Sequence, residues 1–167
     1  MSKKIAFDVK TLILCAILIV GLVLAIIGFV GNFTKGDGIM NDVNKTLSDL
    51  VKLNKDLGDD YHLEGFVLIN IVVWVTFILV IATTVMFAIV KFLGLNKLST
   101  VLSLVGCVTV VAAVLVIVFS LIMVGKWADR ADLIVSLGNN VRVSAGPILM
   151  LIGGLFAGGA AAASAKI

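Results

Sequence analysis

Four side chains that could bind a cation lie close together between the first and second long apolar stretches of the sequence. They are Asp59, Asp60, His62 and Glu64. Carboxylate oxygens and imidazole nitrogens are common ligands of divalent metals. His62 is the only histidine, however, so one chain cannot supply a pair of histidine ligands. We interpret these residues as a solvated loop and predict no metal or cofactor, with a cation site as the alternative.

Residues suited to catalysis are otherwise sparse. The sequence has no G-x-x-x-x-G-K-[ST], H-E-x-x-H or C-x-x-C motif. Cys15 and Cys107 both fall within long apolar stretches, where cysteine usually acts as a small packing residue. No basic stripe with interleaved aromatic residues supports nucleic-acid binding. We therefore expect a protein that is not an enzyme and that binds no nucleic acid.

The composition of the chain predicts which secondary-structure elements carry these residues. Of the 167 residues, 61% are hydrophobic and only 14% are charged, which is far from the average of soluble proteins. A helix rising 1.5 Å per residue needs about 20 apolar residues to cross roughly 30 Å of hydrocarbon. Four stretches meet this length, at residues 11–30, 66–90, 98–125 and 147–165. The sequence predicts an all-α, integral membrane four-helix (tetraspan) bundle with antiparallel neighbours.

The four stretches contain no Asp, Glu, Lys, Arg or His, and these residues lie instead in the connections and near the chain ends. Proton relays and ion-coupled carriers place such groups inside the membrane, so coupled transport is disfavoured. Connection 31–65 carries seven acidic residues and four lysines, whereas turn 91–97 carries lysines alone. Excess lysine marks the cytoplasmic side. We predict a cell-membrane protein with cytoplasmic N- and C-termini and with two external loops, 31–65 and 126–146.

Small residues in two of the predicted helices recur at spacings that favour close helix packing. They are Gly153, Gly154, Ala157 and Gly158 in the fourth stretch, and Gly21 and Gly28 in the first. Small side chains let helix backbones approach closely in lipid, where the hydrophobic effect does not drive association. The pattern indicates contact with another helix of the same bundle or, as the alternative, an oligomer interface.

The first external loop contains an apolar seam with alternating spacings of three and four. Its members are Met40, Val43, Leu47, Leu50, Asn54, Leu57 and Tyr61. This spacing predicts an amphipathic helix over about residues 41–57, capped by Asn41 or Asp42. We expect its apolar face to pack on the outer end of the bundle, although pairing with another subunit or protein is also consistent with the pattern.

The sequence of the second external loop predicts less regular structure than that of the first. A short helix is expected at about residues 127–137, ended by Gly138. The alternation of Val141 and Val143 with polar residues allows a short extended piece before Pro147.

Asn70 is the polar residue in the membrane that most needs an explanation. It lies one helical turn before Trp74, on the same face of the second predicted helix. An amide in hydrocarbon needs a hydrogen-bond partner. We expect an interhelical hydrogen bond, the alternative being that Asn70 lines a wet cavity.

These features predict a non-enzymatic multi-pass protein in the lipid bilayer. It would be a scaffold or subunit of a membrane complex, self-associating as a homo-oligomer or binding a membrane-protein partner through its external loops. The alternative is an oligomeric pore or small-solute channel, because weakly polar Thr, Ser and Asn side chains can line a conduit.

Overall fold

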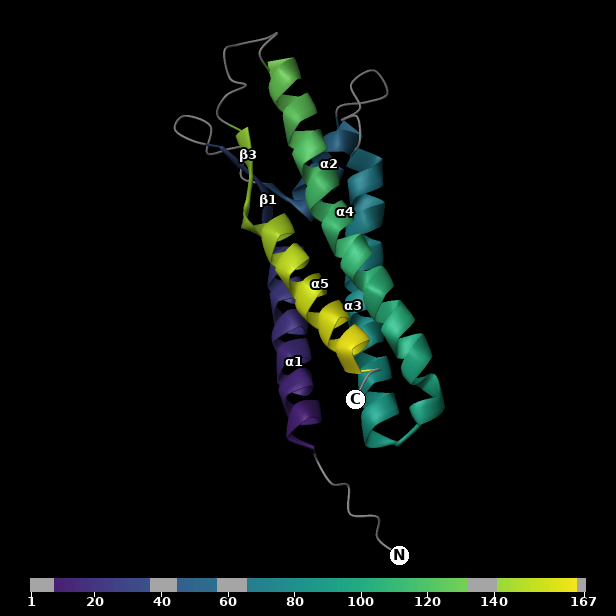
Figure 1. Ribbon diagram of the computed structural model, residues 1–167. Coiled ribbons are helices and arrows are strands. Elements are labelled where there is room, and N and C mark those ends of the chain that lie inside the picture. The colour runs from purple at the N-terminus through teal and green to yellow at the C-terminus, as the bar shows by residue number, and fades with distance from the viewer. Residues whose placement is uncertain (1–7, 37–44, 57–65, 132–140, 165–167) are drawn as a thin grey trace, which may run out of the picture.

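The computed structural model describes residues 8–36, 45–56, 66–131 and 141–164. Within these ranges, four helices are long and apolar enough to cross a membrane: α1 (Val9–Val30), α3 (Phe66–Phe92), α4 (Ser99–Ala131) and α5 (Ala145–Ser164) (Figure 1). The prediction of an all-α tetraspan bundle is confirmed.

The other three long helices all contact α5. Its most extensive contacts are with α1 on one side and α4 on the other, while α3 packs mainly on α4 and less on α1. At one end of the bundle, a turn with the short 3-10 helix η2 (Asn96–Leu98) joins α3 to α4, and we call this the hairpin end. Gly94 turns the chain there with φ +68°, a conformation that favours glycine.

The opposite end carries smaller elements that we call the cap: strands β1 (Asn32–Gly36), β2 (Lys45–Thr46) and β3 (Val141–Val143), and helix α2 (Leu47–Asp56) (Figure 1). The strands form an antiparallel sheet in the order β2-β1-β3. Strand β3 confirms the extended piece expected before Pro147. Strands β1 and β2 were not predicted, because each is short and lacks a clear alternation of apolar and polar residues.

Helix α2 starts later than the sequence predicts. Residues 45–46 form β2, so a helix running from residue 41 is wrong, and residues 41–44 lie outside the described ranges. Thr46 caps α2 instead of Asn41 or Asp42. Its Oγ1 accepts a hydrogen bond from the Asp49 amide at 3.3 Å, and the Asp49 carboxylate accepts from the Thr46 amide at 3.2 Å. This reciprocal pair is a capping box, in which both side chains satisfy free amides of the first turn.

Helix α4 runs further than the third predicted span. It continues through Gly125 to Ala131, so a break at residue 125 and a separate helix beginning at 127 are wrong. At 33 residues it is about 50 Å long, well beyond the thickness of the hydrocarbon core. A lone glycine costs a helix only about 1 kcal/mol relative to alanine and therefore does not end it. Residues 132–140 lie outside the described ranges.

The largest apolar cluster joins the cap to the bundle. Phe33 from β1 and Leu50 from α2 are both fully buried in it, together with side chains from α3, α4 and α5. The other buried members are Leu47, Phe66, Ile69, Val73, Val116, Met123, Val124 and Met150. The cap is therefore part of the same hydrophobic core as the membrane helices.

Candidate functional site

A pocket of about 480 Å³ lies beneath the cap, where the end of α1, the first turns of α2 and the start of α3 meet. Its wall consists of Phe29 and Val30 from α1; Thr46 from β2; Leu47, Ser48 and Val51 from α2; and Asn70 and Trp74 from α3. The volume and the mostly apolar lining with a few polar groups are typical of small-molecule sites.

Two aromatic side chains, Phe29 of α1 and Trp74 of α3, form part of the pocket wall. Phe29 packs edge-on against Trp74, with 4.8 Å between ring centroids, and stacks on Phe77 at 4.4 Å. Such pairs fix the ring orientations and hold the end of α1 against α3. Trp74 is nevertheless 49% exposed, and Val30, which also lines the pocket, is 65% exposed. The pocket therefore borders the surface that the helices present to lipid.

Asn70 lines this pocket and differs from its prediction. Its Oδ1 atom is buried and has no hydrogen-bond partner among the described residues, so the expected interhelical hydrogen bond is not formed there. A buried acceptor left unpaired costs roughly 1–3 kcal/mol. The alternative interpretation, that Asn70 lines a cavity, agrees with its position.

Helix α2 forms the side of the pocket that belongs to the cap. Leu47 and Leu50 point into the core, while Ser48, Val51, Lys52 and Lys55 are exposed on its other faces. Asn54 lies within α2, whereas Met40, Val43, Leu57 and Tyr61 lie outside the described ranges. Leu47 and Leu50 of the seam therefore pack on the chain's own bundle.

The capping box also sets the charge state of Asp49. Its side-chain and backbone hydrogen bonds with Thr46 lower the pKa of the carboxyl from its ordinary value of 3.8, and Lys45 and Lys52 lower it further. The carboxylate thus stays ionised at neutral pH beside two lysines. The capping box was missed from the sequence, although Thr46 followed three residues later by an acid is its usual signature.

Within the membrane helices, two threonines and Ser103, rather than Asn70, make interhelical hydrogen bonds; Ser103 Oγ donates to the Ala162 carbonyl of α5 at 3.5 Å. Thr83 Oγ1 lies 2.9 Å from Thr109 Oγ1, and both residues are buried between α3 and α4. Thr109 also donates to the Val105 carbonyl of its own helix. Thr76 and Thr84 donate only to carbonyls of their own helix, at 2.7 and 2.8 Å.

The small residues of the first helix face α5. A Cβ placed on Gly21 would lie 2.7 Å from the Gly153 carbonyl oxygen, and one on Gly28 would lie 2.6 Å from that of Gly146. Ala25, between them, is fully buried. Because real Cβ atoms do not approach backbone atoms so closely, glycine is required at both positions for α1 and α5 to pack at this distance.

The second small-residue face of α5 is turned toward α4. A Cβ on Gly154 would collide with the Ala113 side chain, and Gly158 faces the Gly106 carbonyl. Ala157 is fully buried near α1 and α3. Gly106 and Gly146 belong to these contacts but were not singled out from the sequence, although Gly146 precedes Gly153 by seven residues, the same spacing as between Gly21 and Gly28.

The hairpin end has its own polar contact. Lys91 Nζ donates to the Ser164 carbonyl oxygen at 3.0 Å, where α5 ends. A cation at a helix C-terminus balances the partial negative charge of the last carbonyls. Cys15 packs at the edge of the apolar cluster at this end, whereas Cys107 is exposed on α4; both thiols are free.

Among the described residues, no three or more His, Cys, Asp or Glu side chains are grouped so that they could hold a metal. The candidate cation ligands Asp59, Asp60, His62 and Glu64 lie outside the described ranges. The chain matches no protein-family model, no curated protein and no solved structure. The pocket and the cap are the features from which its function has to be inferred.

Proposed function

We propose that the protein is a non-enzymatic multi-pass subunit or scaffold of a membrane complex, and that the cap is the surface that binds its partner. The supporting observation is that the cap shares one apolar cluster with the bundle. Phe33 and Leu50 hold β1 and α2 on the membrane helices, so the cap has a fixed position above the bilayer. A preformed surface binds a partner without the cost of ordering it.

The outward surface of the cap is polar. Lys35, Lys52 and Lys55 are exposed on β1 and α2, and charged rims of this kind favour specific recognition and fast association. We assign the cap to the external side of a cell membrane, since its connections carry the acidic excess and the turn at the hairpin end carries only lysines.

Self-association would have to use the outer helix faces. The close contacts of Gly21, Gly28 and Gly153 are already made within the chain. By contrast, a Cβ on Gly159 would meet nothing within 4 Å, and Phe156 beside it is exposed. This outer face of α5 is the most suitable place for a second copy to approach.

The pore alternative has less support. The hydroxyls that could line a conduit, such as Thr76, Thr83 and Ser120, are buried inside the bundle and hydrogen-bonded there. Outward helix positions carry mostly apolar side chains such as Leu104 and Val111. A channel between copies would therefore be lined by groups that cannot replace the hydration shell of an ion.

Photo-crosslinking in native membranes tests the proposal. A photoreactive amino acid in place of Lys35 or Lys55 samples the cap, and the same amino acid in place of Leu104, which is 65% exposed on α4, samples the lipid-facing surface. We expect a discrete protein adduct from the cap positions and none from the control. If the cap positions give no protein adduct and the purified protein is a monomer without partners, the proposal is wrong.

A further inference from the structure

The pocket beneath the cap lies between the apolar surface of the membrane helices and the polar cap. Val30 and Trp74 belong to the exposed apolar surface of the membrane helices, while Thr46 and Ser48 belong to the polar cap. Tryptophan is enriched where membrane and water meet. An occupant of this pocket would therefore have an apolar part toward α1 and α3 and a polar part toward α2.

Asn70 adds a hydrogen-bonding group at the boundary between these two parts. Its Oδ1 has no partner among the described residues, although the residue lines the pocket. A half-turn of the amide exchanges its oxygen and nitrogen, so the group can offer either two donors or an acceptor. The ester carbonyls and headgroup hydroxyls of a glycerolipid match these two possibilities.

A positive charge on α2 is placed to interact with the phosphate of such a lipid. Lys52 follows Ser48 by one helical turn, lies on the same side of α2 and is exposed. The Asp49 carboxylate accepts hydrogen bonds from Thr46 in the capping box and also interacts electrostatically with Lys52. A phosphate above the pocket would thus meet the Ser48 hydroxyl and a lysine, both of which donate hydrogen bonds to it.

We propose that this pocket binds one glycerophospholipid from the leaflet on the cap side. The first part of an acyl chain lies against Phe29, Val30 and Trp74; the glycerol ester region bonds to the Asn70 amide; and the phosphate lies toward Ser48 and Lys52. The lipid connects α1, α2 and α3 at the base of the cap. This inference is independent of the partner-binding function proposed above.

Native mass spectrometry of the full-length protein tests the proposal. Gentle extraction should leave one phospholipid bound. After delipidation, titration with phosphatidylglycerol should restore one molecule per chain, with weaker binding of phosphatidylcholine and much weaker binding of diacylglycerol, which has no phosphate. Binding to the folded state should also raise the melting temperature as the lipid is added.

Three variants locate the site. Ser48→Trp fills the pocket from an exposed position and should abolish lipid retention, whereas Asn96→Trp, exposed at the hairpin end, should leave it unchanged. Asn70→Leu should weaken binding about fivefold to tenfold, as expected for one lost hydrogen bond, without lowering thermal stability in the absence of lipid.

The proposal is overturned if Ser48→Trp and Asn70→Leu both keep the retention of the unmodified protein. It is also overturned if a peptide or protein, and no lipid, occupies the pocket after extraction. Equal binding of diacylglycerol and phosphatidylglycerol would remove the role assigned to Ser48 and Lys52. Should Ser48→Trp fail to fold, the Asn70→Leu result still decides between a lipid site and a structural amide.

Discussion

At the scale of single residues, the threonine hydroxyls of α3 fall into two groups. Hydroxyls such as that of Thr84 donate a hydrogen bond to a carbonyl oxygen in the preceding turn of their own helix, so they contribute little to helix association. Thr83 differs because its hydroxyl meets Thr109 across the α3–α4 interface. Only the second kind links two elements, and the difference can be measured.

Replacing Thr83 with Val should lower the free energy of unfolding by about 0.6 kcal/mol, the average for interhelical hydrogen bonds in membranes. Thr84→Val is the matched control, because its hydroxyl bonds to the Val80 carbonyl of the same helix. Unfolding in mixed micelles by a denaturing detergent gives both values. Equal effects of the two changes would contradict an interhelical role for Thr83.

Asp49 gives a prediction for the pH dependence of stability. Its pKa in the folded protein lies below its ordinary value of 3.8, so the unfolded state binds the proton more tightly. Ionised Asp49 therefore stabilises the folded protein at pH values above 3.8, and this contribution disappears as the pH falls through the lowered pKa. The pH range concerned is strongly acidic, and neutral conditions leave the capping box intact.

Melting temperatures followed by tryptophan fluorescence check this prediction. The difference between the unmodified protein and Asp49→Asn should be constant from neutral pH to about pH 5 and should shrink as the pH falls below the ordinary pKa of 3.8. A difference that grows on acidification would show that Asp49 is stabilised in its protonated form, contrary to the hydrogen bonds with Thr46.

At the scale of elements, glycine positions determine how closely the helices pack. A Cβ on Gly153 would lie 2.6 Å from both the Ala25 amide nitrogen and the Gly21 carbonyl oxygen, which are backbone atoms that cannot move aside. Gly153→Ala should therefore destabilise the protein by roughly 1–3 kcal/mol, as overpacking does.

Gly159→Ala is the control for this change, because its Cβ would meet nothing within 4 Å. It should be neutral or stabilise α5 by up to about 1 kcal/mol, through higher helix propensity alone. Denaturing-detergent titrations of the two variants compare them directly. If Gly159→Ala is the more damaging change, the outer face of α5 carries a contact with another molecule.

Sequence reasoning predicted elements better than it predicted their ends and contacts. Long apolar stretches determine the four helices, because every backbone group in lipid must be satisfied internally. The start of α2 was misplaced because the apolar spacing continues into residues 41–46, whereas the hydrogen bonds of Thr46 and Asp49 make the helix begin at Leu47. The unpaired Asn70 amide oxygen and the pocket could not be predicted, because both depend on how α1, α2 and α3 converge.

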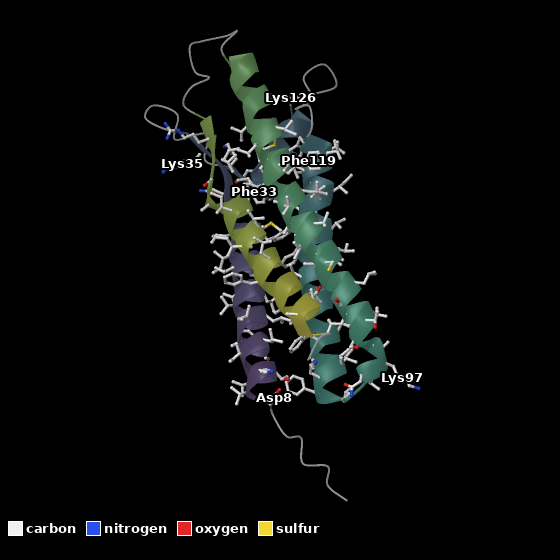
Figure 2. All side chains as sticks on the ribbon, in the orientation of Figure 1. Asp8, Phe33, Lys35, Lys97, Phe119 and Lys126 are labelled. Carbon is white, nitrogen blue, oxygen red and sulfur yellow. The ribbon has the colours of Figure 1, made fainter. Side chains whose placement is uncertain are left out.

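At the scale of the whole molecule, the charged residues that the structure describes lie at the two ends of the bundle. Lys35 and Lys126 lie at the capped end, and Asp8 and Lys97 lie at the opposite end (Figure 2). Lys35 and Lys97 are both exposed. Cysteines at these two positions should therefore react on opposite sides of a membrane.

A membrane-impermeant maleimide applied to intact cells should label Lys35→Cys, with Lys97→Cys labelled only after permeabilisation. Both variants should be made with Cys15 and Cys107 replaced by Ala, so that the native thiols do not contribute. Reversed labelling would invert the proposed orientation and place the cap in the cytoplasm, whereas labelling of both from outside would contradict the bundle's placement in the membrane.

The central place of α5 has a consequence for biogenesis. α1 and α4 both make their most extensive contacts with α5, yet α5 leaves the ribosome after the other three spanning helices. Until then, the backbone grooves at Gly21, Gly28 and Gly106 have no partner. We therefore expect the first three helices to form a less tightly packed intermediate in the bilayer, and a nascent chain halted before residue 145 to be degraded by membrane quality-control proteases.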